Sequence, residues 1–437
     1  MRFHLLAVGL ASAACLFAAC EFNTAPASPR ALAVQHALHD EIDDGAHVVM
    51  GTGDAAIDVP AVQAAVDQGG NVVLKGHFSF GAPPTKPVAS TLGPLVPAAA
   101  EVLLSKAVTI SGGEDDEMPT IDAGTIPFYV EARGAAVTIR RVRFVRPTFS
   151  AVLVAAVDGL EVASNRVEGL QPFGGSAEAI SVITSFAVPT PSSPGSPQNV
   201  AGRLSIVHNY IDAIGGTSHD NTLGVTVFSA GVPGAEVEAN VSGNTIKNTT
   251  EPAINFRRIV GRAHIAHNVI ATGALAGRAL GNQAIRVVNI GTYVIAHNSI
   301  DCGWPTSDAQ GIGVFSQFAA WPIEHAVVVD NDITMSAPAS TAFSASSAGI
   351  GVFGFANDNI VRHNTIRGRA LAGLSIPVFA PPSQTPPSPQ DNAFIRNRFV
   401  SFTPSVADIF VGRQALGTRI VGPGTVVDQG SGTTIQR

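Results

Sequence analysis

Cysteine is scarce in this sequence of 437 residues. It occurs at three positions, Cys15, Cys20 and Cys302, and the first two lie in an apolar N-terminal segment. Cys302 therefore has no partner in the rest of the chain, which excludes a disulfide framework. We expect the fold to take its stability from a packed core.

Charged and aromatic residues are also few, at 14% and 6% of the chain, and the formal net charge is −7. A general nucleic-acid binder is basic, so we expect no nucleic-acid partner. Beyond the N-terminus no apolar run reaches the length of about 18 residues that a spanning helix needs, so we predict none.

The N-terminus, MRFHLLAVGLASAACLFAAC, has a basic residue, an apolar run and then small residues. This order predicts a signal peptide over residues 1–19 and an exported protein. The segment LFAAC resembles the bacterial lipoprotein box, which implies lipidation at Cys20 and a lipid-anchored tether over residues 20–35. Glu21 follows the cysteine, and by the same resemblance this favours the outer membrane over the inner. Ordinary cleavage with release is the alternative.

A six-residue phrase, apolar-x-x-Asn-x-apolar, returns eight times along the chain. Its asparagines are Asn165, Asn209, Asn244, Asn268, Asn298, Asn331, Asn364 and Asn397. Their spacings are 44, 35, 24, 30, 33, 33 and 33 residues, and a period of this size indicates stacked structural units. Asparagine tolerates left-handed backbone and bonds to local backbone groups, so we place it at a bend. In a stack the amides can also bond one another as a ladder.

A second phrase alternates with the first and reads small-apolar-x-apolar, as in AISVI at 179–183 and GIGVF at 311–315. Strict alternation predicts a strand with one buried face, hence at least two short strands in each unit. In this pattern the chain resembles the pectate-lyase-like superfamily, which implies an all-β, right-handed parallel β-helix. We expect one such domain over residues 36–437, with coils over about 100–430, in a monomeric protein.

Residues 54–80 are the predicted N-terminal cap of this solenoid. Asp58 is placed at the N-cap of a short helix, Pro60 in its first turn, and Gly69 and Gly70 at its end. A Val-rich strand follows, and a cap of this kind would cover the open edge of the first coil.

The second phrase also predicts which side chains point outward from one face of the solenoid. Its outward positions include Asn255 and Arg286, and two places further on Arg257, Phe228, Phe315 and Phe353. Aromatic rings can stack on sugars and guanidinium groups can hold carboxylates, so this face suits a polysaccharide that contains uronate. In the alternative, loops cover the phenylalanines and the arginines pair with Glu251 or Asp308.

Catalysis on this face would need further groups. The carboxylates near its edge are Glu178, Asp220, Glu251 and Asp308, and hydrolysis needs two of them on either side of the bond, with Asp220 and Glu251 as the candidate pair. Elimination would need a cation and a base, for which Arg257, Arg286 and His219 are candidates. The Gly-His-Gly and Asp-Pro-His-Asp signatures of related enzymes are missing, so the choice between an enzyme and a binding protein stays open.

Four histidines, His208, His267, His297 and His363, each precede a ladder asparagine. A metal site needs three or four converging ligands, so we read them as solvated turn residues and expect no metal or other cofactor. The sequence thus predicts an exported, lipid-anchored β-helix that binds an extended polysaccharide and that could also process it as a lyase or hydrolase. The alternative is a non-catalytic structural or adhesion protein of the bacterial cell surface.

Overall fold

The computed structural model describes residues 45–88, 99–113, 117–184, 190–194, 196–214, 220–273, 283–338, 347–377 and 388–437. All of them belong to one compact unit, Leu38–Arg437. The predicted signal peptide, the tether with Cys20, and His219 lie outside the described residues. In the described part of the chain, no helix has the length and apolar character needed to cross a membrane.

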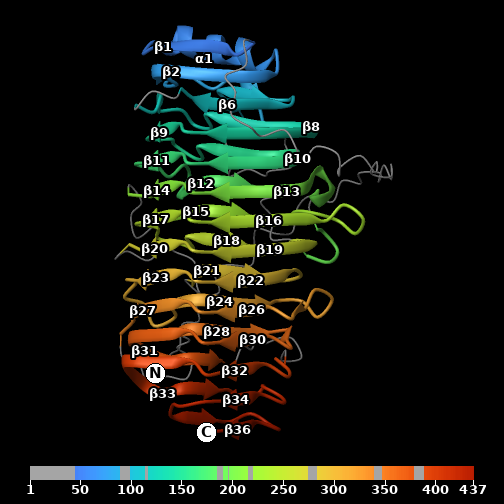
Figure 1. Cartoon of the computed structure of the whole chain (residues 1–437), viewed down its shortest axis with the longest axis vertical. Helices are drawn as coiled ribbons and strands as arrows, with labels where there is room; N and C mark the ends of the chain where they lie inside the picture. The colour runs from blue at the N-terminus through green and yellow to red at the C-terminus, as the bar shows by residue number, and fades with distance from the viewer. Residues whose placement is uncertain are drawn as a thin grey trace, which may run out of the picture. The chain divides into compact units, whose positions relative to one another are not determined.

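The unit is a right-handed parallel β-helix whose coils are stacked along one axis (Figure 1). Each regular coil contributes three strands to three parallel sheets, one more than the two phrases predicted. Several strands run through a corner of the coil, which links the three sheets into one hydrogen-bonded set of 32 strands. The all-β, β-helix prediction is confirmed.

The first sheet supplies, in each regular coil, the strand that comes directly before the ladder asparagine. It contains β1 (His47–Thr52), β2 (Gly70–Ser79), β6 (Val108–Gly112), β13 (Val200–Val207), β16 (Val237–Ser242), β19 (Gly261–Ala266), β22 (Thr292–Ala296), β26 (Val327–Val329), β30 (Ile360–Arg362), β32 (Ala393–Ile395), β34 (Arg419–Val421) and β36 (Thr434–Gln436). The second sheet follows the asparagines. It contains β7 (Thr120–Asp122), β9 (Arg143–Val145), β11 (Arg166–Glu168), β14 (Tyr210–Asp212), β17 (Thr245–Lys247), β20 (Val269–Ala271), β23 (Ser299–Cys302) and β27 (Asp332–Ser336).

The third sheet holds the second phrase. It contains β5 (Val102–Leu104), β12 (Ser176–Val182), β15 (Asn221–Val227), β18 (Ile254–Phe256), β21 (Gln283–Val288), β24 (Gln310–Ser316), β28 (Ala348–Gly354) and β35 (Val426–Asp428). Five strands pass from one sheet to another: β2, whose last residues pair with β7 of the second sheet, and β8 (Phe128–Arg140), β10 (Val152–Ala163), β31 (Thr365–Ile376) and β33 (Arg398–Val411). Two small pairs lie outside: β3 (Lys86–Pro87) with β4 (Ala99–Ala100), and β25 (Ile323–Glu324) with β29 (Ala356–Asn357). A 3₁₀ turn, η3, spans Pro197–Asn199.

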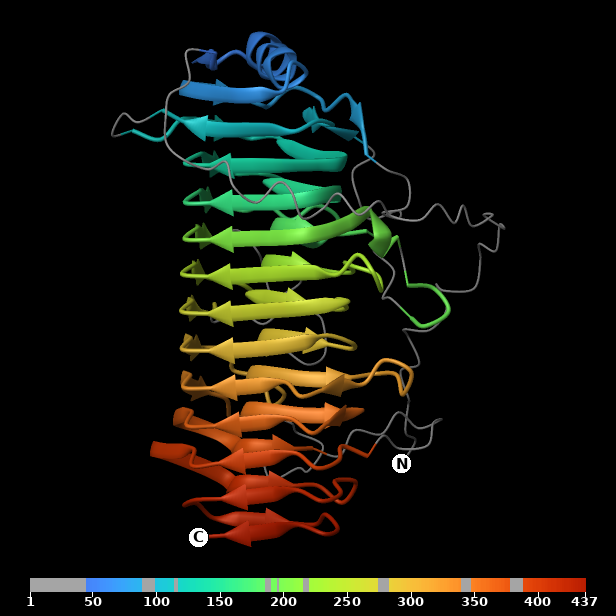
Figure 2. The same ribbon diagram turned by 45° about the vertical axis from the view of Figure 1, so that its right-hand side comes forward.

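Identical register from coil to coil builds the core. The inward residue of the second phrase pairs with its equivalent one coil away through six coils, and all six side chains are buried: Val225, Ile254, Ile285, Ile312, Ile350 and Leu374. Figure 2 shows how regularly the strands repeat down the stack. Each apolar side chain packs on the equivalent side chain of the next coil, so the repeated phrase specifies the fold without a disulfide.

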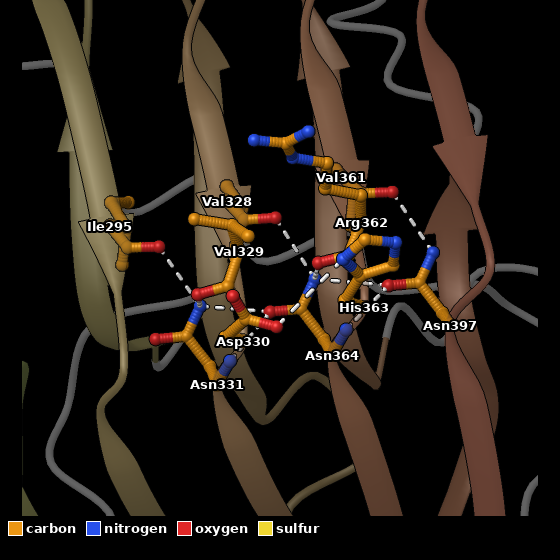
Figure 3. Close-up of polar contacts among 10 residues, drawn as sticks. All are labelled: Ile295, Val328, Val329, Asp330, Asn331, Val361, Arg362, His363, Asn364 and Asn397. Carbon is orange, nitrogen blue, oxygen red and sulfur yellow. Dashed lines mark hydrogen bonds and ion pairs between the residues drawn. The ribbon is translucent and has the colours of Figure 1, made fainter.

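The eight asparagines form a continuous ladder at the corner between the first and second sheets. At each step the backbone N–H and the side-chain Nδ2 of one asparagine donate to Oδ1 of the next, at 2.8 to 3.1 Å. Nδ2 also donates to a backbone carbonyl, as from Asn331 to Ile295 and from Asn397 to Val361 (Figure 3). Each interior amide thus satisfies buried donors and acceptors on both sides.

The left-handed residue of this corner is the one before the asparagine. At the eight positions φ lies between +49° and +65°: Ser164, His208, Gly243, His267, His297, Asp330, His363 and Arg396. Our expectation that asparagine itself takes this conformation was wrong. The asparagine points inward, and its neighbour carries the backbone reversal.

The capping helix begins earlier than predicted. Helix α1 spans Ala55–Val66, and its N-cap is Asp54, whose side chain accepts from the N–H of Ala56. Asp58 is buried inside the helix. Its carboxylate accepts from the N–H groups of Thr52, Gly53 and Ser79 at 2.8, 3.0 and 2.8 Å. Asp58 therefore ties the cap to β1 and β2, a long-range role that spacing along the sequence does not reveal.

Candidate functional site

The side chains that point outward from the third sheet form a column, and it contains the residues that the second phrase predicted. Its members pair in register from coil to coil: Ser181, Thr226, Asn255, Arg286, Gly313, Gly351 and Ser375. The side chains of Asn255 and Arg286 are 0% and 5% exposed. The face that parity along the strand predicts is therefore correct, but its side chains are enclosed rather than open to solvent.

Six residues in and beside the first part of this column form what we call the polar cluster. They are Glu178, Ser181, Glu251, Asn255, Arg257 and Arg286. Arg286 Nε donates to Asn255 Oδ1 at 2.9 Å, and its Nη1 lies 3.9 Å from Glu251 Oε2. On the opposite side of the cluster, Ser181 Oγ donates to Glu178 Oε2 at 2.8 Å.

Burial dominates the electrostatics of the polar cluster. It raises the pKa of Glu178 to about 7, against the opposing effects of the Ser181 hydrogen bond and of Arg257 and Arg286. Burial, together with repulsion from Arg257, lowers the pKa of Arg286 to about 9, while Glu251 and Glu178 oppose the change. The pKa of Arg257 is lowered by burial too, and the same two carboxylates oppose it. Two carboxyl groups and two guanidinium groups thus share one buried region of the protein.

Four predicted residues, Glu251, Asn255, Arg257 and Arg286, come together in this cluster. Glu178, like Glu251, acts to raise the pKa of both arginines by charge attraction. From the sequence we noted Glu178 only as a carboxylate near the edge of this face. Asp220 is half-buried, and its backbone oxygen accepts from Thr250 Oγ1 at 2.6 Å. Asp308 is half-buried just before β24. Glu178 could have been favoured from the sequence because it directly precedes Ala179, the first residue of a second phrase.

The phenylalanines are buried, which agrees with the alternative in which they are covered and not with exposed rings that stack on sugars. Phe228, Phe315 and Phe353 are 9%, 9% and 6% exposed. Phe315 and Phe353 stack with ring centroids 4.6 Å apart, and the guanidinium of Arg257 lies 5.1 Å from the Phe228 ring. Rings on successive coils pack on each other, so the aromatic residues that recur on this face stabilise it by stacking.

Several buried polar atoms on this face have no hydrogen-bond partner within the described ranges. They are Asn255 Nδ2, Arg257 Nε, Gln283 Oε1 and Ser375 Oγ. They lie on β18, β21 and β31 or directly beside these strands. An unpaired buried polar group costs about 1–3 kcal/mol, so these four atoms are candidate contacts for a polar ligand.

The histidines that precede the ladder lie at the corner of the coil. The imidazoles of His267 and His297 stack 5.0 Å apart, and both residues are exposed. Among the residues that the structure describes, no three His, Cys, Asp or Glu side chains gather in a way that could hold a metal ion.

Comparison of the sequence with protein-family models and with characterised proteins gives no match. The fold is similar to that of PfbA, a surface adhesin of Streptococcus pneumoniae, at 14% identity and a TM-score of 0.50, covering 82% of this chain and 90% of that one. A second similar structure is the A-module of the mannuronan C-5 epimerase AlgE4 of Azotobacter vinelandii (14% identity, TM-score 0.32, 89% and 96% covered). A third is tailspike protein 3 of bacteriophage CBA120 (10% identity, TM-score 0.39, 89% and 59% covered). At these identities the likeness concerns the parallel β-helix fold alone.

Proposed function

We propose that this β-helix binds an extended polysaccharide along the outward face of its third sheet. The observation that carries the proposal is the set of buried polar atoms at Asn255, Arg257, Gln283 and Ser375 for which the described residues supply no hydrogen-bond partner. Asn255 Nδ2 and Arg257 Nε are donors, Gln283 Oε1 is an acceptor and Ser375 Oγ can act as either. Neighbouring coils repeat at about 4.8 Å. A hydroxyl-rich polymer can supply complementary groups coil after coil, which a single small ligand cannot.

The two arginines direct the proposal toward an acidic polymer. Arg257 and Arg286 come from adjacent coils, and Asn255 and Glu251 hold the guanidinium of Arg286 in place. A guanidinium whose orientation is fixed loses little entropy when it binds a carboxylate. The polymer would therefore contain uronate residues, in agreement with the expectation from the sequence.

The double variant Arg257→Ala/Arg286→Ala tests this. Each lost charge-assisted contact is worth about 1.5–3 kcal/mol, so the affinity for an oligogalacturonate or oligomannuronate should fall at least about tenfold, measured by calorimetry. Because both guanidinium groups are buried or half-buried, salt screens them weakly. The loss should therefore persist at high ionic strength.

Arg262→Ala is the matched control, since Arg262 is exposed on β19, in the first sheet of the same coil as Arg257. A thermal melt of each variant separates lost binding from lost folding. Equal binding of acidic oligosaccharides by the double variant and the wild type would remove this face from consideration.

A non-catalytic structural or adhesion protein is the second candidate. The contact between Arg286 and Glu251 favours it, because paired buried charges can be purely structural. Catalysis would instead use Glu178 and Glu251 as an acid pair, as a hydrolase does, or the arginines in an elimination. Release of shortened or unsaturated products from a panel of polysaccharides would establish an enzyme, and binding without products would establish the adhesion function.

We also propose that the protein is exported as a monomer and held on the outer membrane by a lipid on Cys20. The lipoprotein-like LFAAC segment followed by EFNTAPASPR supports this. Cys20→Ser should move the protein from the membrane fraction of the cell to the soluble fraction. An unchanged distribution between the two fractions would rule out the anchor.

A further inference from the structure

The connection between β24 and β25, residues 317–322, carries two aromatic side chains at the surface. We call it the Trp321 loop; it leaves the stack at the corner between the third and first sheets, among the orange loops at the right of Figure 2. Phe318 and Trp321 are half-buried and perpendicular, with ring centroids 5.8 Å apart. The other tryptophan of the chain, Trp304, is fully buried and donates to the carbonyl of Thr249.

The Trp321 loop is held in one conformation by its own hydrogen bonds. Ser316 Oγ donates to the carbonyl of Trp321 at 2.7 Å, and it accepts from the N–H of Phe318 at 3.2 Å. The N–H of Trp321 donates to the carbonyl of Phe318 at 3.0 Å, and Asn289 Oδ1 accepts from the N–H of Gln317 at 3.0 Å. An aromatic surface fixed in this way binds a ligand with little loss of conformational entropy.

Two buried polar atoms without partners lie at the same corner. The guanidinium of Arg258, a residue that is 6% exposed, lies over one face of the Trp321 ring, 5.2 Å from its centroid, and its Nη1 donates to Ser229 Oγ and to the carbonyl of Gly231. Its Nε has no acceptor within the described part of the chain, and Gln317 Oε1 has no donor there. Because the Arg258 guanidinium covers one face of the Trp321 ring, a ligand that stacks on the indole uses the other face, in the same loop as the unpaired acceptor Gln317 Oε1.

We propose that the Trp321 loop is a binding site for one pyranose ring. The apolar face of the sugar stacks on the face of the Trp321 indole that the Arg258 guanidinium leaves open, and a sugar hydroxyl donates a hydrogen bond to Gln317 Oε1. The site deepens the proposed function, because Arg258 directly follows Arg257 of the polar cluster, and the same polymer can occupy both places. Stacking does not depend on charge, so neutral and acidic sugars bind here alike.

The test uses Trp321 as its own reporter. In Trp304→Phe, Trp321 is the sole tryptophan, and its emission is recorded with millimolar hexasaccharides of glucose, mannuronate and galacturonate. We expect a blue shift and weaker quenching by iodide as the sugar covers the indole. Calorimetry on Trp321→Ala should show affinity lowered about threefold to tenfold for every hexasaccharide that binds, with Trp321→Phe retaining most of it.

Phe173→Ala is the control, because Phe173 is a 41% exposed aromatic elsewhere on the surface. If Trp304→Phe does not fold, iodide quenching of the wild type replaces it, since iodide cannot reach the buried Trp304. Unchanged Trp321 emission with all three hexasaccharides overturns the inference. If calorimetry nevertheless detects binding, the Trp321 site is refuted but the proposed polysaccharide-binding face is not. If Trp321 emission changes and the Arg257→Ala/Arg286→Ala variant binds as tightly as the wild type, the Trp321 site is supported. The polar cluster is then refuted as a second site for the same acidic polymer.

Discussion

Replacing Asn298 by leucine should lower the free energy of unfolding by about 2 kcal/mol or more. Asn298 Oδ1 accepts from the backbone N–H and from Nδ2 of Asn268, and Nδ2 of Asn298 donates to the carbonyl of Ile265 and to Asn331 Oδ1. All three asparagines are at most 1% exposed, so water cannot replace these partners. Leucine leaves at least two buried groups unpaired, each at about 1–3 kcal/mol.

Ser299→Leu is the matched control, since Ser299 is the next residue and is exposed on β23. Thermal and urea unfolding followed by circular dichroism compares the two variants with the wild type. A melting temperature for Asn298→Leu as high as that of Ser299→Leu would mean that the amide contributes nothing to the stack.

The fold could be predicted because its determinants are local and repeated. Each second phrase places an apolar residue inward, and equal register from coil to coil stacks Ile254 on Ile285 and Ile285 on Ile312. The third strand of each coil was missed because the Asn phrase was read as one strand with a bend. His267, with a φ of 56°, splits it into β19 and β20.

The candidate site could be predicted in part. Parity along β18 and β21 gives the direction of Asn255 and Arg286 correctly, because side chains alternate across a strand. It does not give their burial, which depends on what covers the sheet. The importance of Glu178 was missed for a related reason: it precedes the regular part of its strand, where alternation no longer defines direction. Asp58 was misplaced because its partners, Thr52 and Ser79, are brought to it only by the folded cap.

Replacing Glu178 by glutamine should change how stability depends on pH. Burial raises the pKa of Glu178 to about 7 from its ordinary value of 4.5, so the folded state binds a proton that the unfolded state has already released between these values. The wild type must then lose stability as pH rises from about 4.5 to about 7, and the loss persists above pH 7. The size of the pKa change corresponds to about 3 kcal/mol.

Glutamine keeps the shape of Glu178 and its acceptor oxygen for Ser181, but it cannot ionise. The free energy of unfolding of Glu178→Gln relative to the wild type should therefore increase by about 3 kcal/mol between pH 4.5 and pH 8, measured by urea unfolding at several pH values. Glu238→Gln, which removes an exposed carboxylate on β16, should show no such trend. Parallel pH curves for Glu178→Gln and the wild type would mean that Arg257 and Arg286 keep Glu178 ionised in the folded protein. The polar cluster would then be a fully paired set of charges, and Glu178 could not serve as a proton donor near neutral pH.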